Sequence, residues 1–408
     1  MFRRLALGCG RVAAMAALIL ASVAAAAPRP GRDAARRAAK AHPTASVPLR
    51  ELEPAGTAKF SASGPGVVEM GVQCDANGNV YMNSAPNVQL AIEDAREGAG
   101  EPLTRLSPTS GDTVEFPYGS FHGYARHYAR GFYVGPRGDV YALVEACRQA
   151  GCRAPHFPGD VIVKYNDDGT VDSVIKLKLP AGVHILAFRF AAFLDGNFLV
   201  TGSVLGGPPH YLISKPFTGI FDRGGGYVGP LVLPNDVTPP KQMPPPMPFK
   251  NGKPLHPIHS NGAARPPVLK PGTLWLEDVQ KSLMVGALDG TIYLMRATSP
   301  MRLYTISSTG TVLGERLVTP PKPGLRPAQA SLTEQGMLFV QFQSSPTPEA
   351  PEPHSVFAQV DPQTGKLLEA YSVPSSAGIP ACMDEQNELL FLRSSKSGRL
   401  EVAKYVAQ

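Results

Sequence analysis

Residues 121–130 form a dense polar and aromatic cluster, with the sequence Phe-His-Gly-Tyr-Ala-Arg-His-Tyr-Ala-Arg. Imidazole and guanidinium groups donate hydrogen bonds to anions and to sugar oxygens, and tyrosine adds a flat ring with a polar end. We therefore predict that His122, Tyr128 and Arg130 bind an anionic or sugar ligand. In the alternative interpretation, this segment is a loop that packs its aromatic rings on the rim of the fold.

Cysteines supply a second set of reactive side chains. Cys147 and Cys152 stand five residues apart in a polar loop, and in an exported protein they are expected to form a disulfide. A metal site at this loop is the alternative, but it needs further ligands at characteristic spacing, and only His156 is near.

Familiar catalytic motifs are missing from the chain. It contains neither a Gly-x-Ser-x-Gly nucleophile turn nor a Gly-x-x-x-x-Gly-Lys phosphate loop. The glycines at 224–226 fit a hairpin turn, and Trp275 is the only tryptophan, which argues against tryptophan-ringed quinone sites.

The elements that must position these residues are indicated by a repeated turn. Asp, Asn and Gly between two β-rich runs predict a tight reversal between antiparallel strands. The turn occurs six times, at residues 74–82, 135–141, 194–199, 288–293, 333–339 and 383–390. Two copies depart from the pattern, because Gly135 replaces the Asp and Asn387 replaces the Gly.

A second glycine turn alternates with the first and completes a four-stranded unit. Its glycines are 111, 169, 225, 310 and 365, and the run from Val161 to Pro180 is the clearest copy. Both series of turns have one oversized gap in the same place, which indicates a single insertion. We assign the insertion to the Pro-rich residues 235–271, between the third and fourth units.

Six units of four strands predict an all-β fold, a six-bladed β-propeller of antiparallel blades. Residues 400–406 read as the third strand of the last blade, and residues 47–54 have the alternation and terminal proline of its missing outer strand. We therefore expect an N-terminal strand to close the ring. Cys74 and Cys382 would flank this seam, either as a disulfide or as two buried thiols.

The Asp-x-x-Gly-x-aliphatic-aromatic turns, such as Asp75 to Tyr81, make residues 46–408 resemble six-bladed propellers of the TolB-like and NHL-repeat types. That group includes gluconolactonase-like hydrolases and amidating lyases, whose channel side chains surround a divalent cation. The resemblance implies candidate ligands on the inner strands at Glu69, His127, His184 and Glu277, for calcium or zinc.

The connections between second and third strands are long in four blades, and with the Pro-rich insertion they lie on one face of the propeller. Elaborate loops on a rigid scaffold commonly carry binding sites, although loops in an exported protein also lengthen without function. We predict a module that binds a protein or small-molecule ligand through this face, rather than an enzyme. The alternatives are a metal-dependent hydrolase or lyase with its site in the channel, and a structural scaffold of the cell envelope.

The N-terminus predicts export. Three arginines precede an apolar run at residues 12–23 and small residues at 24–27, so residues 1–27 read as a secretory signal peptide. A retained membrane anchor is the alternative, and no other segment is apolar enough to span a bilayer. Residues 28–45 read as a disordered basic linker. We expect a secreted or periplasmic monomer.

The net charge of +6 comes from the N-terminal segment. Residues 1–45 hold eight of the 39 basic residues and one of the 33 acidic ones, which leaves 31 and 32 in the remainder. A near-neutral body does not favour nucleic acid as a partner.

Overall fold

The computed structural model describes residues 47–63, 67–85, 102–117, 125–147, 159–180, 183–205, 213–234, 282–298, 300–344, 355–374 and 376–408. Every regular element in these ranges is a β-strand. The described residues include no helix with the length and hydropathy that crossing a bilayer requires.

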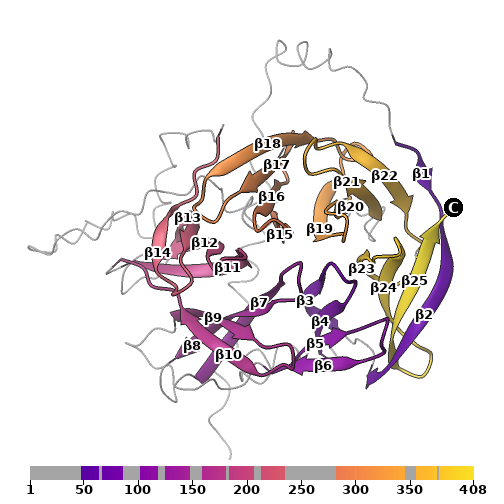
Figure 1. The fold of residues 1–408 in the computed structure, drawn as a ribbon, viewed down its shortest axis with the longest axis horizontal. Coiled ribbons are helices and arrows are strands. Elements are labelled where there is room, and N and C mark those ends of the chain that lie inside the picture. The colour runs from indigo at the N-terminus through magenta and orange to yellow at the C-terminus, as the bar shows by residue number, and fades with distance from the viewer. Residues whose placement is uncertain are drawn as a thin grey trace, which may run out of the picture. The chain divides into compact units, whose positions relative to one another are not determined.

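The strands form six antiparallel sheets arranged around a centre, which confirms the predicted six-bladed β-propeller (Figure 1). In each blade the first strand lies nearest the centre. Blade 1 contains β3 (Val67–Cys74), β4 (Val80–Ala85), β5 (Leu103–Leu106) and β6 (Thr113–Phe116). Blade 2 contains β7 (Ala125–Val134), β8 (Val140–Cys147), β9 (Gly159–Tyr165) and β10 (Val171–Lys176). Blade 3 contains β11 (His184–Ala192), β12 (Phe198–Leu205), β13 (Ile213–Phe221) and β14 (Tyr227–Pro230).

The second half of the ring repeats this order. Blade 4 contains β15 (Leu283–Gly286), β16 (Ile292–Arg296), β17 (Met301–Ile306) and β18 (Val312–Val318). Blade 5 contains β19 (Arg326–Leu332), β20 (Leu338–Gln343), β21 (Ser355–Val360) and β22 (Leu367–Ser372). Blade 6 contains β23 (Ile379–Met383), β24 (Leu389–Ser394), β25 (Arg399–Ala407) and, from the N-terminal end of the described chain, β2 (Leu52–Ser63).

The repeated turn forms for the physical reason that its sequence suggests. One carboxylate oxygen of Asp75 accepts hydrogen bonds from the backbone N–H groups of Asn77 and Asn79, both at 3.0 Å. Asp384 makes the equivalent bonds to Gln386 and Glu388. Asn387, which replaces the usual glycine, has a φ of 62° and is the one non-glycine with positive φ among the described residues.

An N-terminal strand closes the ring, but its position differs from the prediction. β2 pairs antiparallel with β25 over Leu52 to Ser63, so it starts and ends later than the predicted residues 47–54. The preceding β1 (Leu49–Arg50) instead pairs parallel with β22 of blade 5. The prediction took Pro54 as the end of the strand. β2 continues past Pro54 because an outer strand needs no N–H on its open side.

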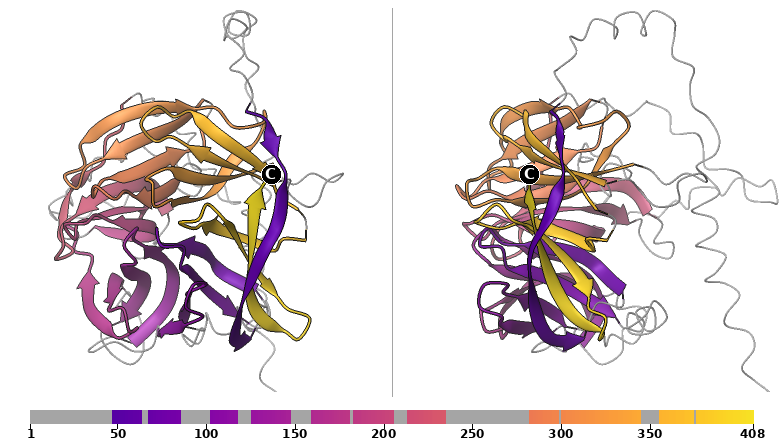
Figure 2. Two further views of the ribbon diagram at one scale, coloured as in Figure 1. Left: turned by 45° about the vertical axis from the view of Figure 1, so that its right-hand side comes forward. Right: turned by 90° about the vertical axis from the view of Figure 1, so that its right-hand side faces the viewer.

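The N-terminal segment therefore contacts two blades, as the side views show (Figure 2). Arg50 forms an ion pair with Glu369 of β22 at 3.2 Å and donates a hydrogen bond to the backbone oxygen of Gln408 at 2.8 Å. Both charged side chains of the pair are about two-fifths exposed, so the pair itself stabilises the fold little. The strand pairing provides most of the closure.

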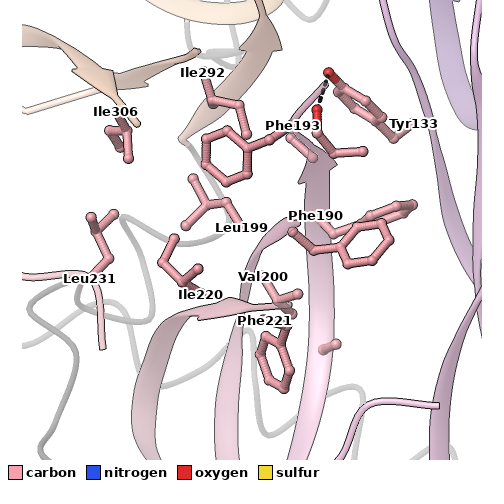
Figure 3. Close-up of a cluster of buried hydrophobic side chains, with 14 of the residues drawn as sticks. Tyr133, Phe190, Phe193, Leu199, Val200, Ile220, Phe221, Leu231, Ile292 and Ile306 are labelled. Atoms are coloured by element: carbon pink, nitrogen blue, oxygen red, sulfur yellow. Dashed lines mark hydrogen bonds between the residues drawn. The ribbon is translucent and has the colours of Figure 1, made fainter. Parts of the chain in front are cut away.

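The hydrophobic core lies between neighbouring blades. Figure 3 shows the largest such cluster, in which Phe190 and Leu199 of blade 3 pack together with Tyr133 of blade 2 and Ile292 of blade 4. The Tyr133 hydroxyl donates a hydrogen bond to the backbone oxygen of Ala192 at 3.2 Å. Blade-to-blade packing of this kind fixes the inner strands relative to one another, and these strands form the wall of the channel.

Candidate functional site

A cavity of about 440 Å³ lies in the central channel and is lined by the inner strands of blades 1 to 5. Its wall comes from residues 71–73 of β3, 130–133 of β7, 188–190 of β11, 283–284 of β15 and 328–330 of β19. Each inner strand starts at the face that carries the predicted long loops. The cavity is a candidate binding site.

A recurring β-bulge shapes this wall. In three blades, one residue of the inner strand has no partner in the second strand. These gaps in the pairing fall between Ala129 and Gly131, between Ala187 and Arg189, and between Pro327 and Gln329. The skipped residues are Arg130, Phe188 and Ala328, and all three line the cavity. A bulge turns side chains out of the regular alternation, and bulges are common beside functional sites.

One position of the repeat shows how the wall is divided. Gly71, Gly131, Arg189, Leu283 and Gln329 each stand seven residues before the turn glycine of their blade, and all five line the cavity. A Cβ atom added at Gly71 or Gly131 would meet no atom within 4 Å, so both glycines border open space. Blades 1 and 2 thus leave room, whereas blades 3 to 5 supply side chains.

Arg189 is the cationic side chain of this set. Its Nη1 donates a hydrogen bond to the backbone oxygen of Ser282 at 2.8 Å, which connects blades 3 and 4. It forms no ion pair with any carboxylate of the described residues. The side chain is accessible from the cavity, yet the surrounding protein lowers the pKa of the guanidinium by desolvation. Arginine remains protonated at neutral pH, so Arg189 presents a positive charge to the channel.

Arg130 has different surroundings. It forms ion pairs with Glu145 of β8 and with Asp160 of β9, the latter at 3.3 Å, and all three side chains are largely buried. The other oxygen of Asp160 accepts a hydrogen bond from the Ala187 N–H of blade 3 at 2.8 Å. Burial raises the pKa of Asp160 to about 6, although the Arg130 charge acts in the opposite direction. Arg130, Glu145 and Asp160 thus form a buried ionic cluster in the channel wall.

Two glutamines hold the cavity wall together. Gln73 donates to the backbone oxygen of Phe132 at 2.6 Å and accepts from the Val134 N–H at 3.0 Å, which joins blades 1 and 2. Gln329 of blade 5 donates to the backbone oxygens of Val72 and Ala381, in blades 1 and 6. These bonds fix the position of the wall before any ligand arrives.

The structure places the predicted site residues unevenly. Arg130 lines the cavity. The backbones of Glu69, His127, Tyr128 and His184 belong to the inner strands β3, β7 and β11, but their side chains lie outside the described part of the chain. His122, Cys152, His156 and Glu277 are outside the described residues altogether. Within the described residues, no three His, Cys, Asp or Glu side chains are arranged to hold a metal ion.

The cysteines of the seam are bonded to each other. A disulfide joins Cys74 at the end of β3 to Cys382 in β23, with 6.1 Å between their Cα atoms. It connects the first blade to the last across 308 residues of sequence. Cys147 ends β8, and its predicted partner Cys152 is not among the described residues.

Sequence reasoning missed Arg189, Gln329 and the two open glycines. These residues share a feature that is visible in the sequence, because each stands seven residues before the turn glycine of its blade. A strict period of two along the inner strands does not reveal which side chains face the channel, because the bulge shifts the alternation.

No protein-family model matches the chain, and neither does any curated protein. Solved structures with the same kind of fold do match. A gluconolactonase from Xanthomonas campestris is 12% identical, with a TM-score of 0.42 and coverage of 86% of this chain and 89% of that one. A protein of unknown function from Dyadobacter fermentans is 9% identical, with a TM-score of 0.46 and coverage of 88% and 99%. Virginiamycin B lyase from Staphylococcus aureus is 8% identical, with a TM-score of 0.37 and coverage of 87% and 99%.

Such low identities and TM-scores carry no argument about what this chain binds or catalyses.

Proposed function

We propose that this propeller is a binding module for a small organic anion, with a carboxylate group held by Arg189 in the central channel. The observation that carries the proposal is an accessible guanidinium that lines a cavity and has no carboxylate partner among the described residues. Hydrogen bonds between charged groups are about twice as strong as neutral ones, and low hydration strengthens them further.

The remainder of the cavity suits a compact ligand. Its volume of about 440 Å³ falls within the usual range for small-molecule sites, which combine apolar walls with a few polar groups. Phe188 and Met284 are half-buried and supply apolar surface, while the glycines at 71 and 131 leave space for ligand atoms. Arg130 is already engaged by the carboxylates of Glu145 and Asp160. The anionic end of the ligand therefore belongs at Arg189.

The test measures binding of small carboxylic acids to the purified protein by thermal shift and calorimetry, with the matching primary amides as neutral controls. We expect some acids to bind and their amides to bind at least ~10-fold more weakly. Arg189→Gln should abolish the preference for acids, and Arg189→Lys should retain part of it. Gly131→Leu should block binding sterically while Arg189 stays in place.

If the affinities for acids and amides in Arg189→Gln and in Gly131→Leu are the same as in the wild type, the channel is not the binding site. Unfolding curves of the two variants exclude misfolding as the cause of any loss.

Metal-dependent hydrolysis or lysis in the same channel is the second candidate function. One observation favours it: Glu69, His127 and His184 all belong to strands that line the channel. Metal analysis after dialysis against calcium or zinc tests it. Stoichiometric metal that is lost in a His127→Ala/His184→Ala variant supports this function, and absence of bound metal in the wild-type protein excludes it.

A further inference from the structure

A second concavity, of about 820 Å³, lies in blade 6 where β2 runs beside β25 and the turn between β24 and β25. We call it the seam groove, because its two sides come from opposite ends of the described chain. Lys59 and Ser61 of β2 form one side, and residues 393–399 and Glu401 form the other. Its lining contains four basic side chains, four serines and one carboxylate.

The positive charges of the groove are not balanced locally. Glu401 forms an ion pair with Arg393 at 3.2 Å, and both are partly or mostly buried. Lys59, Lys396 and Arg399 are exposed, and none of them forms an ion pair with a carboxylate of the described residues. The chain beyond residue 45 has 31 basic and 32 acidic residues, so three uncompensated cations in one groove depart clearly from its average.

The groove has a defined local structure. In the turn, the Ser395 hydroxyl accepts a hydrogen bond from the Arg399 N–H at 2.9 Å and contacts the Ser397 hydroxyl at 2.9 Å. Arg393 also donates to the Thr57 hydroxyl of β2 at 3.3 Å, which connects the two sides. In the strand register Lys59 lies opposite Glu401, so ring closure brings the β2 cation to the cations of β24, of β25 and of the turn between them.

We propose that the seam groove binds a phosphate monoester, a dianion that several cations and hydroxyl donors can surround. Lysine suits phosphate as a point charge, arginine offers two parallel N–H donors, and the exposed hydroxyls of Ser61 and Ser394 add neutral donors. The phosphate can belong to a soluble phosphorylated small molecule or to the headgroup of a lipid. The site is independent of the channel, because the two cavities share no residue.

The experiment uses the purified full-length protein and glycerol 1-phosphate as the soluble probe. Sodium chloride at matched ionic strength separates specific binding from screening. We expect saturable binding by calorimetry that weakens at least ~10-fold in Lys59→Gln/Arg399→Gln. Lys176→Gln/Lys178→Gln is the matched control, because these two exposed lysines lie in and just after β10 of blade 2, outside the groove, and their replacement also removes two positive charges.

Co-sedimentation with vesicles that contain phosphatidic acid distinguishes the lipid source from the soluble one. Binding of either probe that depends on Lys59 and Arg399 supports the proposal. The proposal is overturned if the phosphate binds no more strongly than chloride. It is also overturned if binding is equal in wild type, Lys59→Gln/Arg399→Gln and Lys176→Gln/Lys178→Gln. Arg189→Gln should leave this binding unchanged, so the outcome is separate from that of the channel proposal.

Discussion

The two halves of the channel wall are built from the same repeat, yet they differ in chemistry. In blades 1 and 2 the position seven residues before the turn is glycine, and the nearby Arg130 is paired with two buried carboxylates. In blades 3 to 5 the same position holds Arg189, Leu283 and Gln329. Blades 1 and 2 therefore supply space and a buried ionic cluster. Blades 3 to 5 supply the groups that can contact a ligand.

This contrast shows why a residue type alone does not identify a site. Arg130 and Arg189 both line the cavity, but Arg130 is held by Glu145 and Asp160, whereas Arg189 is held by a backbone oxygen. A buried arginine with two carboxylate partners is expected to have a structural role. An arginine that keeps its charge without such partners is available to an incoming anion.

The largest expected effect comes from removing each arginine in turn. Arg130→Met leaves Glu145 and Asp160 without their cation in a buried place, which should cost about 3–5 kcal/mol of unfolding free energy. Arg189→Met removes one hydrogen bond to a backbone oxygen and should cost about 1 kcal/mol. Urea denaturation measures both. Equal losses would show that the two arginines do not differ as the structure indicates.

A smaller effect concerns pH. Burial raises the pKa of Asp160 to about 6 in the folded protein, above the ordinary value of 3.8 that it should have when unfolded. The folded state therefore binds this proton more tightly, and the stabilisation is complete below about pH 4 and lost as pH rises through 6. A shift of this size corresponds to about 3 kcal/mol at most.

The measurement is the unfolding free energy between pH 4 and pH 7.5 for wild type and Asp160→Asn. The difference between the two curves should change with this sign, because asparagine does not titrate. Asp75, whose pKa is also raised by burial, contributes equally to both curves. Parallel curves would mean that Asp160 has an ordinary pKa in the folded protein.

The fold could be predicted from the sequence because its turns have a local cause. An Asp that binds the backbone two and four residues later, and a residue that accepts positive φ, are visible in residues 75–79 and again in 384–388. Proline was a poorer guide. The terminal proline of residues 47–54 predicts a strand end, but β2 continues through Pro54 as an outer strand.

The channel site could be predicted only in part, for a geometric reason. The inner strands were identified, and Arg130 was chosen from the cluster at residues 121–130. The sequence pattern does not predict Arg189, because the bulge between Ala187 and Arg189 changes which side chains face the channel. In addition, partners from other blades decide which charge is neutralised. The seam groove depends in the same way on β2 meeting β25, a contact between distant parts of the chain.

The smallest expected effect compares the two glycines of the open half. Both border empty space, but Gly71 has a φ of 86° and Gly131 does not have a positive φ. Gly71→Ala should therefore lose about 1 kcal/mol of unfolding free energy through backbone strain, while Gly131→Ala should be neutral or slightly stabilising. Urea denaturation of the two variants gives the difference directly. Because each adds one methyl group to the same cavity, a similar loss in both would mean that the wall is packed at Gly131 as well, and that the space proposed for the ligand is not open.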